Sequence, residues 1–481
     1  MGMTSATITF HGGAGTVTGA NFLLEIHPVR EKSRSNIGTE AAPKGEAFSN
    51  GAGTKKILVD CGIHEREQLC DPGNYSAFPY DPTSIDVLFI THAHADHIGR
   101  VPKLVRDGFK GIIYSTPATK ELSAIMFEDA LSIMKESADT QNCGILYESA
   151  DVSRALSLWQ TREYHDPFEV GDVQAEFLDA GHILGSAMVK FSRQGRKVIF
   201  TGDLGNSPEP LLNDTESPEG SNYMVMESVY GDRVHEQREE RSSRLEQVIK
   251  ETLARKGVLL IPSFSIERTQ ILLFEIHAIL ESGSVPKIPV YLDSPLAIRV
   301  TEVFRRYMKL MNPKAQEHFA GGVDPFSFPG LVLTSGGDES KAIHHSPNPK
   351  IIVAGAGMSH GGRIRRHEKT YLGDNHTTLL FVGYQAPGSL GRRIQDGEKR
   401  VEIDGEHITV RARVETVTGY SGHKDREGLL DFAGEAADTL EKVFVTMGEP
   451  KSSLFLAQRL QDFLGIKAVV PDAGQSFEIE W

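Results

Sequence analysis

The stretch Thr91-His92-Ala93-His94-Ala95-Asp96-His97-Ile98-Gly99-Arg100 places three imidazoles and a carboxylate within six positions. The run before it, residues 85–90, is short and mostly apolar, which is the pattern of a buried strand. A strand that ends in such a turn can direct several side chains at one point. Neutral imidazoles and a hard carboxylate suit Zn²⁺ and, less exclusively, Mn²⁺ or Fe²⁺. We therefore predict a metal site here rather than a histidine-rich surface turn.

Composition is that of an ordinary globular chain. Its 481 residues can form about two to three domains, with 39% hydrophobic and 24% charged residues. No run approaches the roughly 18 apolar residues of a membrane helix, and residues 1–6 carry no basic segment of a signal peptide. The three cysteines, Cys61, Cys70 and Cys143, are too few and too widely spaced for a disulfide framework. We expect a cytoplasmic protein without a membrane span.

The net charge of −14 argues against a large basic surface for polyanions. It does not exclude a nucleic-acid substrate, because local arginines and divalent cations can make one region attractive.

Several further segments read as strands that end in turns. Residues 7–26 predict a hairpin, residues 27–54 a polar, mobile loop, and residues 56–62 a strand. Asp60 at the end of that strand either orients a ligand imidazole or caps a turn. Asp203 follows the strand-like run 197–200, and its two carboxylate oxygens make it the natural bridge between two cations.

The His-x-His-x-Asp-His motif resembles the signature of the metallo-β-lactamase superfamily. The resemblance implies an αββα sandwich that holds two metal ions at one edge. A second segment also resembles this superfamily, Ala180-Gly181-His182-Ile183-Leu184-Gly185-Ser186-Ala187. The resemblance implies that His182 is a metal ligand. A lone histidine would otherwise most often be structural.

Residues 223–233 look like the Glu-Ser-Thr-Tyr-Gly segment of the β-CASP branch, whose members cut nucleic acids and carry an inserted α/β domain. Alternating strand and helix patterns in this region predict a parallel open sheet. We expect a first domain of residues 1–214, an inserted domain of 215–380, and a return to the first domain over 381–481.

The resemblance also implies an RNA-binding surface on the inserted domain. The turn at residues 355–364 is rich in glycine and would let backbone N–H groups approach a phosphate. The expected contacts are Arg268, Ser294, Ser359, Gly361, Gly362 and Arg363. The alternative is ordinary turn chemistry with surface arginines.

The last family motif is Val417-Thr418-Gly419-Tyr420-Ser421-Gly422-His423, and it implies that His423 completes the second metal set. Two departures stand out. Met447 occupies a position where family members commonly carry histidine, and Arg393 replaces a histidine of the eukaryotic pre-mRNA 3′-end cleavage subunit, as in a bacterial and archaeal subgroup. Because arginine does not release its proton, we expect Arg393 to pair with Glu227 or to clamp a phosphate.

These inferences predict a zinc-dependent ribonuclease with two zinc ions per chain, acting on single-stranded RNA through a hydroxide shared by the metals. The expected metal ligands are His92, His94, Asp96, His97, His182, Asp203 and His423. The expected catalytic residues are Asp96, Glu227, Arg393 and His423. Internal cutting is expected, with cutting from an end and a homodimer left open. The alternatives are a small-molecule hydrolase, such as a thioesterase or lactamase, a non-catalytic RNA-binding scaffold, and, more weakly, a preference for DNA.

Overall fold

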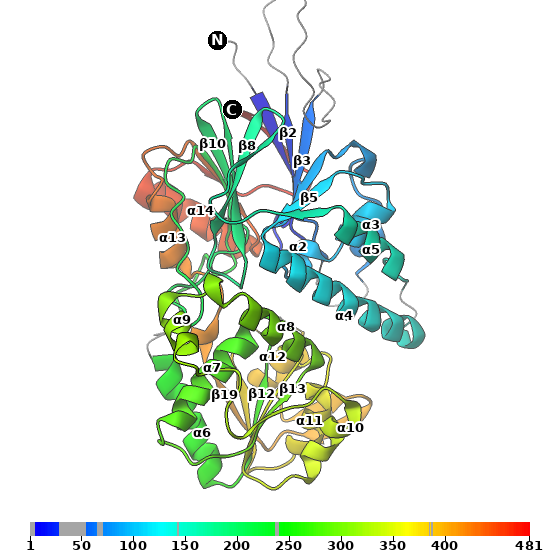
Figure 1. The fold of residues 1–481 in the computed structure, drawn as a ribbon, viewed down its shortest axis with the longest axis vertical. Helices are drawn as coiled ribbons and strands as arrows, with labels where there is room; N and C mark the ends of the chain where they lie inside the picture. Colours follow the sequence, from blue (N-terminus) through cyan, green and yellow to red (C-terminus); the bar gives the residue numbers. More distant parts are fainter. Residues whose placement is uncertain are drawn as a thin grey trace, which may run out of the picture.

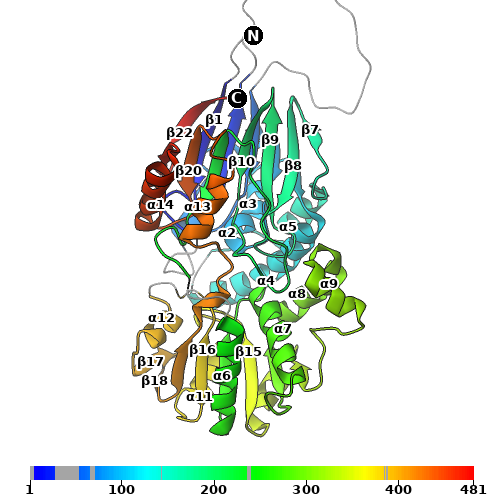
Figure 2. The ribbon, with the colours of Figure 1, turned by 90° about the vertical axis from the view of Figure 1, so that its left-hand side faces the viewer.

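The computed structural model describes residues 5–27, 54–64, 71–141, 144–235, 240–383, 385 and 388–481. The mobile loop predicted for residues 27–54 lies outside the described residues except at its two ends. The chain forms two lobes (Figures 1 and 2). The upper lobe in these views is built on two facing sheets, and the lower lobe is built on a third sheet.

The first sheet of the upper lobe has seven strands in the order β22-β1-β2-β3-β4-β5-β6. Its strands are β1 (Ser5–Gly12), β2 (Asn21–Ile26), β3 (Lys55–Val59), β4 (Val87–Phe89), β5 (Ile112–Ser115), β6 (Trp159–Thr161) and β22 (Ser476–Glu480). The pairs from β22 to β3 are antiparallel, and those from β3 to β6 are parallel. Strand β22, from the end of the sequence, therefore forms the edge of the first sheet beside β1.

The second sheet also has seven strands, in the order β21-β20-β11-β10-β9-β8-β7. Its strands are β7 (Phe168–Val170), β8 (Val173–Asp179), β9 (Ala187–Arg193), β10 (Arg196–Phe200), β11 (Tyr223–Glu227), β20 (Lys442–Thr446) and β21 (Ala468–Val469). In strand β10, successive side chains point to opposite faces of the sheet. Val198 and Phe200 face the first sheet, whereas Ile199 faces the helices on the outside.

Helices cover both outer faces of this sandwich, as Figure 1 shows. On the side of the first sheet lie α1 (Pro72–Tyr75), η1 (Pro82–Ser84), α2 (Ala95–Ile98), α3 (Val101–Arg106), α4 (Pro117–Gln141) and α5 (Ser149–Ser157). On the side of the second sheet lie α13 (Arg426–Gly434) and α14 (Pro450–Leu464), which pack on Met224 and Val445. Aromatic rings fill the space between the sheets, among them Phe10, Phe89, Phe191 and Phe200. The predicted αββα sandwich is confirmed.

The lower lobe contains a six-stranded sheet in the order β14-β13-β15-β12-β16-β19. Its strands are β12 (Val258–Pro262), β13 (Val290–Asp293), β14 (Leu331–Leu333), β15 (Lys350–Ala354), β16 (Thr378–Phe381) and β19 (Arg413–Thr416). All neighbouring strands run parallel, which confirms the predicted parallel open sheet. Strand β12 is buried on both faces, with Leu259 and Leu260 in different core clusters.

The helices of this lobe are α6 (Arg241–Ala254), α7 (Arg268–Glu281), α8 (Pro295–Arg306), η3 (Met308–Leu310), α9 (Pro313–Ala320), α10 (Gly337–Ala342), η4 (Ile343–His345), α11 (Ile364–Tyr371) and α12 (Leu390–Gln395). Helix α6 leads into β12, and the others lie in the crossovers between the parallel strands of the lobe. A hairpin of β17 (Arg400–Ile403) and β18 (Glu406–Thr409) follows α12, and η5 (Thr418–Tyr420) follows β19.

The chain stays in the lower lobe for longer than we expected from the sequence. We placed the return to the first lobe at residue 381, but β19 pairs with β16 in the six-stranded sheet. The sheet of this lobe therefore extends to residue 416. Residues 381–416 carry no metal-ligand motif. The sequence therefore offered no local signal that the chain returns to the upper lobe only after residue 416.

Among the residues described, no helix is both long enough and apolar enough to cross a membrane.

The aromatic core between the two sheets yields a stability prediction. Phe191 is fully buried against Phe89 and Phe200, and its replacement by alanine should lower the free energy of unfolding by about 3–5 kcal/mol. The matched control is Phe463→Ala, because Phe463 is 67% exposed and should change stability by less than about 0.5 kcal/mol. Denaturant unfolding followed by tryptophan fluorescence measures both, and equal midpoints for the two variants would contradict this packing.

Candidate metal centre

The predicted ligand residues converge because each follows a strand or turn that ends at one edge of the sandwich. His92, His94 and His97 follow β4, His182 follows β8, and Asp203 follows β10. Backbone hydrogen bonds tie these turns together across the two sheets. Ala187 N donates to Thr91 O at 2.8 Å, and Gly205 N donates to Ala180 O at 2.8 Å. The turns pack so closely that a Cβ on Gly205 would lie 1.9 Å from Gly181 O.

Four donor atoms form a compact cluster at this edge. His94 Nδ1 lies 3.1 Å from His92 Nε2 and 3.2 Å from His182 Nε2. Asp203 Oδ2 lies 3.4 Å from His92 Nε2 and 3.5 Å from His182 Nε2. A tetrahedral Zn²⁺ with bonds of about 2.0–2.1 Å would separate its ligand atoms by about 3.3 Å. The spacing of the four atoms therefore fits one tetrahedral cation.

The environment of this cluster keeps the two central imidazoles neutral. Burial, helped by the nearby His92 ring, holds the pKa of His94 well below its usual value. Burial, helped by His423, does the same for the pKa of His182. A neutral imidazole has a lone pair on one ring nitrogen, which is the form that binds a metal.

A second group of residues shares Asp203 with the first. His97 Nε2 lies 3.3 Å from Asp203 Oδ1 and 3.8 Å from Asp96 Oδ2. His423 Nδ1 lies 4.0 Å from Asp203 Oδ2. Burial acts to lower the pKa of His97, but the three carboxylates of Asp203, Asp60 and Asp96 outweigh it and hold that pKa well above the usual value. This excess of carboxylates would be balanced by a bound cation.

Asp60, which we expected to orient an imidazole, lies against His97. Its Oδ2 is 2.8 Å from His97 Nδ1, and it accepts hydrogen bonds from Thr91 N and Thr91 Oγ1, both at 2.8 Å. With Nδ1 of His97 facing Asp60, Nε2 is turned toward Asp203. Thr91 also contacts His92 Nδ1 at 3.0 Å. We did not single out Thr91 from the sequence, although its place directly before His92 was a usable signal.

Glu227 fixes His423. Its Oε1 lies 3.1 Å from His423 Nδ1 and accepts from Leu204 N at 2.7 Å. Burial would lower the pKa of His423, but the charge of Glu227 outweighs it and raises that pKa to about 9. The backbone of His423 is held as well, because His235 Nε2 is 3.0 Å from the carbonyl oxygen of His423. His235 has no motif around it, and nothing in the sequence pointed to this contact.

The loop before His423 also supports the first cluster. His182 Nδ1 donates to Gly422 O at 2.9 Å, which leaves Nε2 of His182 directed at Asp203 and His94. Asn206 N donates to the same carbonyl at 3.2 Å, and Asn206 Nδ2 donates to Ser421 O at 3.1 Å. One short loop therefore orients ligand candidates of both groups.

Arg268, expected as an RNA contact, reaches this edge from the start of α7. Its Nη2 lies 3.3 Å from the position of a Cβ on Gly422, beside the His182 ring. Its Nε and Nη1 are buried and have no hydrogen-bond partner among the described residues. A buried guanidinium with free donors is suited to an anion that enters from outside the chain.

The other expected RNA contacts lie in the lower lobe. Ser294 caps α8 by accepting from Ala297 N, and its Oγ is 3.4 Å from Ser265 Oγ, a neighbour that we did not predict. Ser359 is fully buried beneath the glycine turn. In that turn Gly361 O accepts from Ala356 N, and Gly362 has φ of +70° and lies against Gly355 O. The backbone therefore requires glycine at position 362.

The donors of Arg363 are committed within the lobe. Its Nη1 donates to Asp293 Oδ1 at 2.7 Å and to Thr334 O at 2.9 Å, and its Nη2 donates to Ser335 O at 2.6 Å. This guanidinium ties the turn after β15 to the ends of β13 and β14. A phosphate would have to displace these partners, and the expected contact of Arg363 with RNA stays a prediction.

Arg393 does not pair with Glu227. It lies at the surface on α12, and its Nε and Nη2 donate to the two carboxylate oxygens of Glu398, each at 2.7 Å. The expected pairing was wrong because Glu398 follows the end of the same helix and is closer, whereas the alternative role of Arg393, a contact with a phosphate, stays a prediction. Met447, the other departure, is buried in the core, where its sulfur packs against Gly13.

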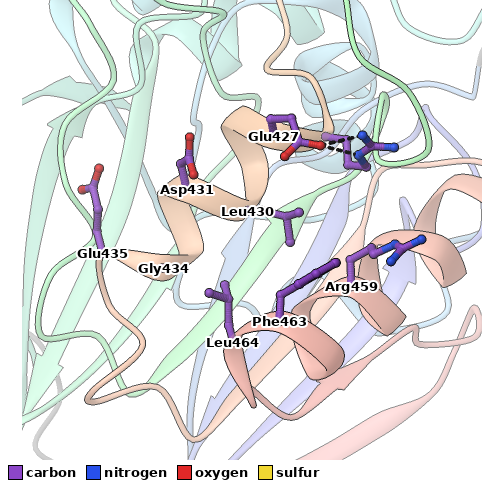
Figure 3. Close-up of a pocket in the computed structure, with 9 residues that line it drawn as sticks. Glu427, Leu430, Asp431, Gly434, Glu435, Arg459, Phe463 and Leu464 are labelled. Atoms are coloured by element: carbon purple, nitrogen blue, oxygen red, sulfur yellow. Dashed lines mark hydrogen bonds and ion pairs between the residues drawn. The ribbon is translucent and has the colours of Figure 1, made fainter.

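A separate hollow lies between α13 and α14 and is unrelated to the cluster (Figure 3). Its volume is about 740 Å³, and its lining includes Leu430 and Phe463, the arginines Arg426 and Arg459, Glu427 and Asp431 of α13, and Glu435 directly after that helix. None of the predicted site residues borders it.

Comparisons with known proteins agree with this geometry. The model of the metallo-beta-lactamase superfamily matches residues 51–247, the Beta-Casp domain matches 269–394, and the Zn-dependent metallo-hydrolase RNA specificity domain matches 407–471. A crystal structure of a protein of unknown function from Enterococcus faecalis superposes with a TM-score of 0.54 over 99% of this chain and 100% of that chain. At 12% identity it supports the fold alone.

Three curated relatives are similar along most of this chain. Ribonuclease TTHA0252 of Thermus thermophilus is 36% identical and covers 86% of this chain and 93% of its own length. The RNase J-like protein of Methanocaldococcus jannaschii is 30% identical, covering 87% of this chain and 93% of its own length. The transcription termination factor FttA of Methanosarcina mazei is 30% identical over 86% of this chain, which spans only 66% of that protein. The chain belongs to the β-CASP branch of the metallo-β-lactamase superfamily.

Proposed function

We propose that this protein is a zinc-dependent ribonuclease that hydrolyses phosphodiester bonds of single-stranded RNA. The observation that carries the proposal is the tetrahedral spacing of His92 Nε2, His94 Nδ1, His182 Nε2 and Asp203 Oδ2, at 3.1–3.5 Å. Nitrogen and carboxylate donors at this spacing suit Zn²⁺. Two relatives whose names include ribonuclease or RNase J-like support the reaction class.

Each ligand has a defined place in this proposal. His92, His94 and His182 would hold one ion, and Asp96, His97 and His423 would hold the other. Asp203 lies between the two groups, with Oδ2 beside His92 and Oδ1 beside His97, and would bridge them. Two such ions, when bound, lower the pKa of water and offset charge that develops on a phosphoryl group.

The surrounding side chains prepare the ligands for that role. Asp60 accepts from His97 Nδ1, the Gly422 carbonyl accepts from His182 Nδ1, and Glu227 accepts from His423 Nδ1. For His97 and His182 this contact fixes Nδ1 as the proton carrier and leaves Nε2, which faces Asp203, for the ion. In His423 the same nitrogen, Nδ1, faces both Glu227 and Asp203. Glu227 therefore acts through His423, as a positioning residue, rather than on the substrate.

Arg268 would bind the phosphate. Its buried guanidinium lies beside Gly422 and His182, close to both groups of ligands. Its Nε and Nη1 meet no acceptor in the parts of the chain that the structure describes, so each could donate to a different oxygen of a phosphate. Local positive charge of this kind allows a chain with a net charge of −14 to accept RNA. The match of residues 407–471 to an RNA specificity domain agrees with an RNA substrate.

Replacing a ligand tests the metal site and the reaction together. His94 Nδ1 is a corner of the first cluster, so His94→Ala should lose zinc and lower the cleavage rate of a labelled single-stranded RNA by more than about 100-fold. The matched control is His376→Ala, because His376 is an exposed histidine of the lower lobe that contacts only Asp374 in the described structure. Zinc content by mass spectrometry accompanies each assay.

Undiminished cleavage by His94→Ala, or by wild-type protein after chelation, would reject the proposed mechanism. Turnover of a thioester without cleavage of RNA would instead assign the same metal site to a small-molecule hydrolase.

Arg268→Lys tests the phosphate contact, since lysine keeps the charge but has a single donor group in place of the separate Nε and Nη donors. Hydrogen bonds to charged groups contribute about 1.5–3 kcal/mol, so cleavage of RNA should fall about 10–100-fold while zinc content stays at the wild-type level. Arg154→Lys is the matched control, because Arg154 is exposed on α5 and pairs with Asp151. A variant with unchanged cleavage would show that Arg268 does not contact the phosphate.

A further inference from the structure

Three charged side chains meet in the interior where the two lobes touch. Arg241 Nε donates to Glu275 Oε1 at 2.9 Å, and Arg241 Nη1 donates to Glu209 Oε2 at 3.1 Å. All three side chains are more than nine-tenths buried. Glu209 belongs to the upper lobe, in the loop after β10, whereas Arg241 begins α6 and Glu275 lies on α7. We call these three residues the inter-lobe triad.

The inter-lobe triad also contacts the segment that precedes His423. Arg241 Nη1 donates to Gly419 O at 3.3 Å, and its guanidinium lies 5.3 Å from the centre of the Tyr420 ring. The Tyr420 hydroxyl donates to Glu275 Oε2. Tyr420 is fully buried, so its ring cannot move without disturbing the triad.

From Tyr420 the chain runs directly into the metal centre. Two residues on, the Gly422 carbonyl accepts from His182 Nδ1 at 2.9 Å, and His423 follows it. A shift of Gly419 and Tyr420 would therefore move both the carbonyl that orients His182 and the backbone of His423. These histidines belong to different groups of ligands, so one support sets the geometry of both.

Stability alone does not explain why three charges are buried at this place. Taking charges out of water is costly, and apolar residues of similar volume often replace a buried ionic triad without loss of stability. What distinguishes the triad from an apolar contact is that its hydrogen bonds have fixed directions. The planar fork of Arg241 reaches two carboxylates and a backbone carbonyl at once, which fixes how the upper lobe, the lower lobe and the loop before His423 lie relative to one another.

We propose that Arg241 is a positioning residue, held by Glu209 and Glu275, that sets the loop of Gly419 to Gly422 so that His182 and His423 lie at metal-binding geometry. The inference rests on the proposed function in one respect, which is that these two histidines bind metal. It adds that the junction of the two lobes controls the metal centre.

The test separates positioning from folding by comparing two variants. Arg241→Met leaves two buried carboxylates unpaired and should lose both stability and zinc affinity. The triple variant Glu209→Gln, Arg241→Met, Glu275→Gln removes all three charges and should recover most of the unfolding midpoint. We expect the triple variant still to bind zinc about 10–100-fold more weakly than wild type, as when a residue that supports a metal ligand is lost.

Zinc affinity is measured by competition with a chromophoric chelator, starting from metal-free protein. Arg244→Met is the matched control, because Arg244 lies one turn along α6 but is exposed and pairs with Glu415, and it should bind zinc as wild type does. Arg241→Lys should restore part of the affinity. Tyr420→Phe, which removes only the hydroxyl, should weaken zinc binding several-fold, and it carries the test if the triple variant does not fold.

A triple variant or a Tyr420→Phe variant with wild-type zinc affinity would overturn the role of Arg241 and leave the proposed function standing. Wild-type protein that binds no zinc would overturn both.

Discussion

The structure depends on one buried carboxylate. Asp203 lies at the end of β10 within 3.5 Å of three imidazoles that come from two other strand ends. A buried carboxylate is costly unless cations or donors surround it, so the turns that carry these imidazoles must be held in register. The sandwich provides that register through backbone hydrogen bonds between turns of the two sheets, such as Ala187 to Thr91 and Gly205 to Ala180.

Much of the fold and of the cluster could be predicted from the sequence, because the signals were local. An apolar run followed by a turn with His, Asp or Gly marks a strand end, and strand ends of one sandwich meet at one edge. Residues 91–97 carry several ligand candidates in a single turn, and β12, β13 and β15 show the uniform burial of parallel strands. The imidazole and carboxylate groups of these residues then limited the choice of metal ion to Zn²⁺, Mn²⁺ or Fe²⁺.

The predictions that failed concerned pairings between side chains or the path of the chain between motifs. Arg393 meets Glu398 rather than Glu227. A guanidinium reaches several ångströms in many directions, so its partner depends on the packed structure and not on its neighbours in sequence. The same holds for β19, because a short strand of mixed burial without a motif gives no sign of the sheet to which it belongs.

The pairing of Arg393 with Glu398 clarifies the role of Glu227. Without an arginine beside it, Glu227 is held by Leu204 N and has His423 as its charged partner in the described structure. A carboxylate in this position fixes the His423 proton on Nδ1 and turns Nε2 away from itself. The inter-lobe triad acts on the same histidine through the backbone, because Tyr420 donates to Glu275 and lies three residues before His423. The side chain of His423 is therefore held by Glu227 of the upper lobe, and its backbone is held by the triad at the junction of the lobes. A ligand fixed in both ways has little freedom to adapt, so the separation of the lobes and the geometry of the metal centre should change together.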